Sequence, residues 1–345
     1  MYNPNFLYTN KIVKNLTLTA EARTIILNSP LIPKWEVSLR KEALIRSAHS
    51  STSIEGNPLS LEEVSALAKG RDIMARRKDK QEVLNYLEAL ERILELAKRT
   101  PFTPRDLLEV HKIVTKETLE NPKDEGIFRD RQVFVGNRIT GEVVFMPPPT
   151  EQVSELINEF FDWFNSPGAD ELDPVIHAGI THYELVRIHA FVDGNGRTAR
   201  IMASLVFYER GFDVKRFFAL DDYYDNDRRA YYAALKSVDQ KTLDLTGWLE
   251  YFTEGIAVSI KDLKNKVIGL SKDIKVLKEK GQIALTERQM KIVEKIIQND
   301  RIAINEVVKE FGVSRQMALK EMNKLVNLSV IRLRGKGRGA YYELV

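Results

Sequence analysis

The clearest chemical pattern in this chain lies in residues 189–200, which read HAFVDGNGRTAR. Gly194, Asn195 and Gly196 allow successive backbone N–H groups to converge, and a helix that begins there adds the positive end of its dipole. Converging N–H groups at a helix N-terminus attract negative charge. The segment therefore predicts an anion-binding cradle.

Four side chains around this cradle could bind a phosphate group and act on it. Arg197 and Arg200 lie three residues apart on the predicted helix, so their guanidinium groups project to one side and can donate to phosphate oxygens. Asp193 lies where a magnesium ion that bridges those oxygens would need a carboxylate. His189 precedes the loop and can accept a proton near neutral pH. Together the four residues predict a phosphate-ester reaction on a nucleotide.

Each of these residues also has an ordinary structural explanation. Glycines mark turns, surface arginines lie in solvent, and a histidine can pack in a core. However, Ile201, Leu205 and Tyr208 already supply the apolar stripe of the helix, so its packing does not require Arg197 or Arg200. The combination at this spacing favours a functional site.

The stretch resembles the signature of the Fic family, HPFxxGNGRxxR with an acidic residue before the first glycine. It departs from that signature at Ala190, where proline is more usual, and we expect this change to loosen the loop slightly without removing a catalytic group. The resemblance extends over roughly residues 40–250. Fic proteins mostly transfer AMP from ATP to a hydroxyl side chain of a target protein and release pyrophosphate.

The resemblance implies a role for each residue of the stretch. His189 would be the general base that deprotonates a Ser, Thr or Tyr hydroxyl, and Asp193 would hold the magnesium ion between the α- and β-phosphates. The backbone amides of residues 194–196, with the Asn195 side chain, would cradle the phosphates. Arg197 would stabilise the leaving pyrophosphate, and Arg200 would bind the γ-phosphate. The expected set of ATP- and phosphate-binding residues is Gly194, Asn195, Gly196, Arg197, Thr198, Ala199, Arg200, Tyr231 and Tyr232, the two tyrosines lying where related proteins place an aromatic ring near the adenine.

A second motif concerns regulation. Residues 51–56 read STSIEG and resemble the inhibitory motif of the family, (S/T)xxxE(G/N). Ser51 and Glu55 are four residues apart and share one helical face. The resemblance implies that Glu55, followed by Gly56, pairs with Arg200 and occupies the arginine that should hold the γ-phosphate. The alternative is a surface helix end, where Glu-Gly is common.

The pattern of apolar residues predicts a mainly α-helical protein. Apolar residues recur three and four apart through most of the first 260 residues, and Asp173 with Pro174 predicts the start of one helix. Residues 127–144 instead alternate around turn-forming glycines and predict a short β-hairpin. The resemblance implies that this hairpin is the Fic flap, which docks the target by strand addition.

The C-terminal part has a different composition and predicts a separate unit. A Lys-rich stretch over 255–284 is followed by capped helices, from Thr286 and Ser314, and by a glycine-rich basic hairpin. Residues 285–345 carry 12 Lys/Arg and 7 Asp/Glu. This order resembles a winged helix-turn-helix, for which both DNA binding, with the basic residues of the wing and a recognition helix near Arg315, and protein interaction remain open.

The expected fold is therefore a Fic-type helical core with a short β-hairpin flap and a C-terminal winged helix-turn-helix domain. We expect a helical region with the inhibitory motif over 1–100, the catalytic core over 101–253, a connecting segment over 254–284 and the winged helix over 285–345. The predicted function is self-inhibited protein adenylyl transfer. Two alternatives remain: a DNA-binding regulator that senses a nucleotide, and a phosphodiesterase that removes AMP with the same site.

Composition excludes several other classes of protein. The absence of cysteine rules out disulfides, thiolate metal sites and cysteine nucleophiles, and a structural zinc is not expected. The net charge of +3 requires that any nucleic-acid surface be local. With no long apolar run and no signal-peptide pattern, we expect a cytoplasmic protein. Expected partners are ATP, with magnesium, and a target protein, while DNA and a second copy in a homodimer are candidates.

Overall fold

The computed structural model of the chain describes residues 2–29, 31, 33–136, 143–212, 214–274, 285–299, 301–328, 330–335 and 337–344. Within these residues the protein is mainly helical, with two small antiparallel hairpins. This confirms the predicted mainly helical fold, and the winged helix-turn-helix stays a prediction. None of the helices in the described part of the chain is long and apolar enough to cross a membrane.

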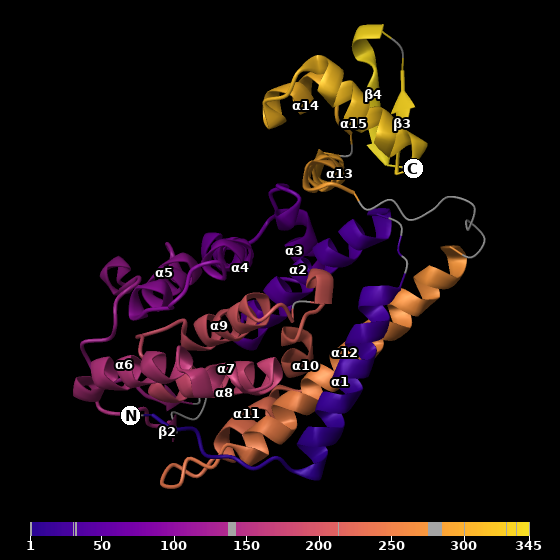
Figure 1. The fold of residues 1–345 in the computed structure, drawn as a ribbon. Helices are drawn as coiled ribbons and strands as arrows, with labels where there is room; N and C mark the ends of the chain where they lie inside the picture. Colours follow the sequence, from indigo (N-terminus) through magenta and orange to yellow (C-terminus); the bar gives the residue numbers. More distant parts are fainter. Residues whose placement is uncertain are drawn as a thin grey trace.

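The helices fall into three consecutive groups along the chain (Figure 1). The first group is α1 (Asn10–Asn28), α2 (Pro33–Ile54), α3 (Leu61–Ala68), α4 (Arg77–Leu96) and α5 (Pro104–Thr115). The second group is α6 (Val153–Phe164), α7 (Pro167–Asp170), α8 (Pro174–Ile188), α9 (Asn195–Glu209), α10 (Asp221–Asn226), α11 (Arg228–Lys236) and α12 (Thr246–Ile274). The third group is α13 (Glu287–Asn299), α14 (Ile304–Phe311) and α15 (Arg315–Asn327).

Helix α8 lies at the centre of the main core and is buried along almost its whole length. It begins where the sequence predicts, because the Asp173 carboxylate accepts a hydrogen bond of 2.8 Å from Val175 N. Helices α9 and α12 pack against it. Trp248 Nε1 of α12 donates to the carbonyl oxygen of Gly179 at 2.8 Å, and the missing side chain at Gly179 allows this close approach. The residues before and after α8 are thus held in a rigid frame.

Helices α1 and α12 lie side by side along the edge of the molecule (Figure 1). Asn15 Nδ2 donates to Thr253 Oγ1 at 3.1 Å in their interface. Helix α12 runs without interruption across the boundary expected between 253 and 254. The division of the chain at that point stays a prediction, and residues 275–284 of the expected connecting segment lie outside the described residues.

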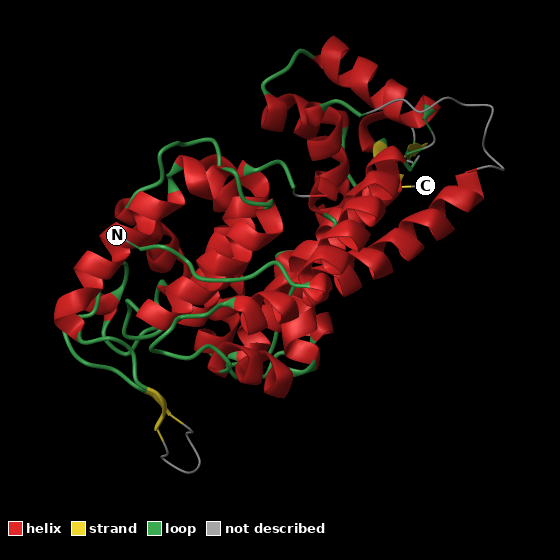
Figure 2. Ribbon diagram, turned by 60° about the horizontal axis from the view of Figure 1, so that its bottom comes forward, coloured by secondary structure: helices red, strands yellow, loops and turns green. Residues whose placement is uncertain are grey.

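The predicted hairpin is present as β1 (Val135–Gly136) paired antiparallel with β2 (Val143–Phe145). Val135 is opposite Phe145 and Gly136 is opposite Val143. Figure 2 shows the hairpin projecting away from the helical body. The sequence predicts a turn from Gly136 through Gly141, of which Gly136 belongs to β1 and 137–141 lie outside the described residues.

The C-terminal unit has the element order that the sequence predicts. Helices α13, α14 and α15 are followed by β3 (Ile331–Arg334) and β4 (Tyr341–Leu344), an antiparallel hairpin. Ser314 Oγ caps α15 by accepting from Met317 N at 3.2 Å. Ile302 and Tyr342 form an additional bridge between the loop before α14 and β4. The unit has a second hydrophobic core, which includes Ile292, Val307, Met322 and Tyr342 and is joined by Val37 of α2.

Candidate active site

His189 lies directly after the last residue of α8, in a left-handed backbone conformation with φ of 51°. Its Nδ1 is 3.2 Å from the carbonyl oxygen of Val186. Because a carbonyl oxygen only accepts, Nδ1 carries the proton of the neutral ring and the lone pair is on Nε2. Burial lowers the pKa of His189, so the ring is neutral at physiological pH and Nε2 can accept a proton.

The loop that carries His189 is held by Arg129, a residue that the sequence analysis missed. Arg129 N donates to Ala190 O and Arg129 Nε donates to His189 O, both at 2.9 Å. The other end of the guanidinium donates to Thr150 Oγ1 at 2.7 Å and to Pro148 O at 2.5 Å. A buried arginine that joins two loops leaves no periodic signal in the sequence. Arg129 thereby couples the backbone around the histidine to the segment that follows β2.

Helix α9 begins at Asn195, within the segment for which the sequence predicts an anion cradle. Gly194 precedes the helix with φ of 80°, and a side chain there would collide with Thr115. The Asn195 side chain, in contrast, is directed away from the cradle: its Nδ2 and Oδ1 form hydrogen bonds of 2.9 Å with Phe191 O and N. In this structure the side chain bonds to Phe191, and its contact with phosphate stays a prediction. Asn195 shapes the loop, which leaves backbone N–H groups to receive the anion.

His111 of α5 supports the same loop from behind. Its Nδ1 accepts from Gly126 N at 3.0 Å, so Nε2 carries the proton and donates to Asp193 O at 2.9 Å. The ring stacks on Phe191 with centroids 3.6 Å apart. Burial lowers the pKa of His111 to about 4, which keeps the ring neutral. The sequence analysis found no role for this histidine because its partners are distant in the chain.

Asp193 is the exposed carboxylate of the site. About half of its side chain, 51%, is accessible. Its Oδ1 accepts from Gly194 N at 2.5 Å and lies 3.5 Å from Arg197 Nη2. No group of three or more acidic or histidine ligands occurs in the described part of the chain. A single accessible carboxylate beside a phosphate cradle still fits magnesium, whose other ligands are usually phosphate oxygens and water.

Arg197 and Thr198 lie in the first turn of α9 and are both buried. Arg197 Nη1 is 3.5 Å from Glu82 Oε1. Within the described residues, Arg197 Nε and Nη1 and Thr198 Oγ1 have no hydrogen-bond partner. Buried donors of this kind are usually satisfied by a ligand or by water. Ala199, the next residue, is fully buried and contributes packing.

Arg200 is almost completely buried and is joined to α2. Its Nε donates to Ser51 Oγ at 2.6 Å, and Nη2 donates to Ser51 O at 2.9 Å and to Glu55 Oε1 at 2.8 Å. Glu55 follows the last residue of α2, and Gly56, with φ of 93°, turns the chain away. A side chain at Gly196 would collide with Glu55 Oε1. The Glu55 carboxylate thus lies against both Arg200 and the anion cradle.

The two tyrosines of α11 differ in accessibility. Tyr231 is 1% exposed. Its hydroxyl forms a hydrogen bond of 2.9 Å with His182 Nε2, and its ring stacks on Tyr224. The ring is enclosed by its neighbours in this structure, and its contact with the adenine stays a prediction. Tyr232 is 42% exposed and keeps a free ring surface.

Comparisons with known proteins agree with this geometry. Residues 101–207 match the model of the Fic/DOC family. The chain is 30% identical over 221 residues to the protein adenylyltransferase Fic of Drosophila willistoni, covering 61% of this chain. It is 33% identical over 195 residues to the protein of the same name from Nematostella vectensis, covering 54% of this chain. The matched region spans less than half, 43%, of each of these relatives.

A similar arrangement occurs in a solved structure. A Fic family protein from Desulfovibrio desulfuricans G20 is 22% identical, superposes with a TM-score of 0.66, and matches 100% of this chain and 98% of its own. This likeness concerns the fold. Together with the named relatives it supports one conclusion: residues 101–207 match the Fic/DOC family, and the chain has the fold of a solved Fic family protein.

Proposed function

We propose that this protein transfers AMP from ATP to a hydroxyl side chain of a target protein and that its own Glu55 restrains the reaction. The proposal depends above all on the contact between Glu55 and Arg200 beside a histidine whose Nε2 can accept a proton. The names of the two curated relatives, both protein adenylyltransferases, support the same activity.

The proposed reaction is an in-line displacement at the α-phosphorus. His189 Nε2 takes the proton of the acceptor hydroxyl, and the hydroxyl oxygen forms a bond to the α-phosphorus. The bond from that phosphorus to the oxygen that bridges the α- and β-phosphates breaks, and pyrophosphate leaves with its electron pair. The product is an AMP ester of the target. Positioning and electrostatic stabilisation supply most of the catalysis in reactions of this kind.

The residues of the cradle stabilise the charge that develops on the phosphates. Backbone N–H groups of Asn195 and Gly196 receive the phosphate oxygens at the N-terminus of α9, and that of Gly194 joins them if it leaves Asp193 Oδ1. Arg197, with unpartnered buried donors, stabilises the departing pyrophosphate. Asp193 would hold a magnesium ion, which would supply positive charge to the phosphates. Tyr232 is the exposed aromatic residue available to the adenine.

In the inhibited state Glu55 takes the place of the γ-phosphate. Both are anions that accept from the same guanidinium, so they compete for Arg200. ATP that lacks this contact is bound less tightly, and its α-phosphate is badly aligned for attack. Because 33% of the Glu55 side chain is exposed, α2 can release it with little change in the surrounding core. The acceptor segment of the target would pair with the hairpin of β1 and β2.

The experiment that tests this proposal uses ATP labelled at either the α- or the γ-phosphate. Wild type, Glu55→Gly and His189→Ala are incubated with magnesium and labelled ATP, and protein-bound label is measured on the protein itself. We expect label only from the α position, with at least a tenfold increase in Glu55→Gly and none in His189→Ala. Glu55→Gln is the matched control, because it keeps the size of the side chain and should give an intermediate increase.

Other outcomes would assign a different activity. Label from the γ position would indicate phosphorylation. Unchanged labelling and unchanged ATP affinity in Glu55→Gly would refute inhibition by Glu55. Absence of label from either position, with ATP still bound, would favour removal of AMP from a modified target, or nucleotide sensing.

We propose DNA as a second ligand, bound by the C-terminal unit. Helix α15 exposes basic and amide side chains, and its single acidic residue, Glu321, accepts a hydrogen bond from Gln289 of α13. The exposed basic and amide residues of α15 are Arg315, Gln316, Lys320, Asn323, Lys324 and Asn327. This composition suits a helix that lies in the major groove. Arg332 and Arg334 of β3 add positive charge, although Glu343 pairs with both.

A further inference from the structure

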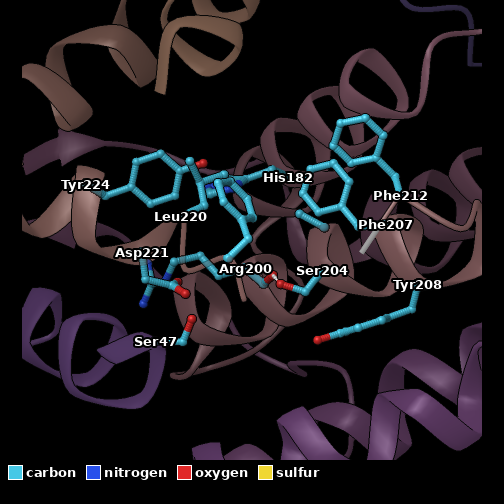
Figure 3. Close-up of a pocket in the computed structure, with 12 residues that line it drawn as sticks. Ser47, His182, Arg200, Ser204, Phe207, Tyr208, Phe212, Leu220, Asp221 and Tyr224 are labelled. Atoms are coloured by element: carbon cyan, nitrogen blue, oxygen red, sulfur yellow. Dashed lines mark hydrogen bonds and ion pairs between the residues drawn. The ribbon is translucent and has the colours of Figure 1, made fainter. Parts of the chain in front are cut away.

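Arg200 is approached by two carboxylates from different parts of the chain. Glu55, after α2, contacts Nη2 at 2.8 Å. Asp221, the first residue of α10, has its Oδ1 at 3.5 Å from Nε. Figure 3 shows Asp221 and Ser47 beside Arg200, and all three residues line one cavity. Asp221 lies outside both sequence motifs, residues 51–56 and 189–200.

The two carboxylates differ in how easily they can move away from Arg200. The Asp221 side chain is 7% exposed, compared with 33% for Glu55. Tyr86 Oη donates to Asp221 Oδ1 at 3.3 Å, and the Ser47 hydroxyl also contacts this carboxylate. Asp221 therefore stays with Arg200 when Glu55 is released.

Asp221 affects Arg200 mainly through its negative charge and does little to orient the guanidinium group. Arg200 Nε donates to Ser51 Oγ at 2.6 Å, which fixes the orientation of the guanidinium, whereas the carboxylate of Asp221 is an ion-pair partner at 3.5 Å. Burial raises the pKa of Asp221, and Arg200 with the hydroxyls of Ser47 and Tyr86 opposes that rise. Its negative charge offsets part of the positive charge that Arg200 presents to an incoming anion.

We propose that Asp221 is the permanent counter-ion of Arg200 and that, acting through this arginine, it sets how strongly Glu55 and a terminal phosphate are held. The part that concerns the phosphate rests on the proposed function, and the part that concerns Glu55 does not. A second carboxylate weakens both competing contacts. As a result, Glu55 can leave Arg200, and ATP does not bind too tightly.

The variant Asp221→Asn tests this inference because it keeps the shape and one acceptor oxygen but removes the charge. Without that charge, Arg200 should hold Glu55 more tightly. In the absence of nucleotide, the backbone amides of residues 47–55 should therefore exchange their hydrogens about threefold to tenfold more slowly than in wild type. Asp221→Glu, which restores the charge, should return the exchange rate toward the wild-type value.

The neighbouring residue supplies a matched control. The Asp222 carboxylate accepts from Ser50 Oγ at 2.6 Å and pairs with Arg46, both on α2. The substitution Asp222→Asn removes the charge that pairs with Arg46 and weakens the contact with Ser50. Because both residues lie on α2, this variant should speed the exchange of the same amides. Opposite signs for Asp221→Asn and Asp222→Asn separate a charge effect on Arg200 from general loosening of α10. Equal or faster exchange in Asp221→Asn would overturn the inference.

Nucleotide binding supplies a second measurement, by titration calorimetry in the presence of magnesium. In a Glu55→Gly background, Asp221→Asn should lower the Kd for ATP about threefold to tenfold and leave the Kd for AMP unchanged. Weaker ATP binding, or an equal change for both nucleotides, would contradict the inference. If Glu55→Gly itself binds ATP no more tightly than AMP, the proposed contact of Arg200 with the γ-phosphate is wrong, and the exchange experiment alone decides the role of Asp221.

Asp221→Ser, a second neutral variant, replaces Asp221→Asn if the latter does not fold, and must change both measurements in the same direction.

Discussion

At the scale of single residues, one hydrogen bond decides which nitrogen of His189 can act as a base. The carbonyl oxygen of Val186 requires a proton on Nδ1, so Nε2 is the nitrogen that can accept one. The left-handed conformation of His189, at the end of α8, turns the chain toward the cradle. Arg129 and His111 hold the backbone on both sides of the loop. A base and an anion site are thereby fixed relative to one another before any substrate binds.

The pH dependence of transfer follows from the environment of His189. Burial lowers its pKa below the ordinary value of about 6.5. The reactive, neutral form therefore persists as the pH falls to about 6.5 and is lost only at lower pH. We expect the single-turnover rate of AMP transfer by Glu55→Gly to be constant between about pH 8 and 6.5 and to decrease below that range. A decrease centred at or above about pH 6.5 would show that the environment does not favour the neutral ring.

At the scale of elements, the contact between α8 and α12 determines how firmly the base is held. Trp248 of α12 donates to the backbone of Gly179, and α12 approaches α8 so closely that a side chain at Gly179 would touch Leu249 and Phe252. Because α8 ends at the residue before His189, a shift of this helix would move the base. Helix α2 depends on the tertiary fold in a different way, since its last turn is held by side chains of α9 and α10.

Gly179→Ala tests the close approach of the two helices. The added methyl group would overlap with Leu249 and Phe252, so we expect a loss of about 1–3 kcal/mol in the free energy of unfolding. Gly269→Ala is the matched control: it lies in α12 with open space around it and should stabilise the protein by about 0.5–1 kcal/mol through helix propensity. Urea unfolding followed by circular dichroism measures both. Equal effects of the two substitutions would contradict the packing described for Gly179.

At the scale of the whole molecule, charge is distributed unevenly between the Fic region and the C-terminal unit. Residues 285–345 carry 12 Lys/Arg and 7 Asp/Glu, whereas the whole chain has a net charge of only +3. The remainder is therefore slightly acidic. The excess positive charge of the C-terminal unit suits a polyanion. In the slightly acidic remainder, the attraction for phosphate is local and comes from Arg197, Arg200 and the N-terminus of α9.

The proposal of DNA binding predicts a measurable dependence on salt. Neutralising Arg315, Lys320 and Lys324 together with glutamine should weaken the binding of a labelled DNA duplex in fluorescence anisotropy. The slope of log K against log salt should fall in magnitude by up to about 3, because each phosphate contact contributes roughly 0.9. Neutralising Arg105, Lys112 and Lys123 of the Fic domain is the control and should leave the slope unchanged. The proposal fails if the intact protein shows no salt-dependent binding.

Much of the site could be predicted from the sequence because its parts are contiguous. The loop and the first turns of α9 lie within residues 189–200. Local backbone geometry therefore suffices to predict that the glycines, the arginines and His189 surround one anion site. Helix starts at Asp173 and Ser314 were predictable for the same reason, since a cap bonds to backbone two or three residues away. The pairing of Glu55 with Arg200, 145 residues apart, was expected only from the family motif.

Other features depended on packing between distant segments, and only the tertiary structure decided them. Asn195 binds Phe191 instead of facing the cradle, and Tyr231 is enclosed by Tyr224 and His182, although both residues belong to an expected binding set. Asp221 meets Arg200 because α9, α10 and α2 converge. Residue type and spacing determine which groups can do chemistry. Which of them are free to do it depends on which neighbours satisfy their hydrogen bonds and charges, and folding alone brings those neighbours together.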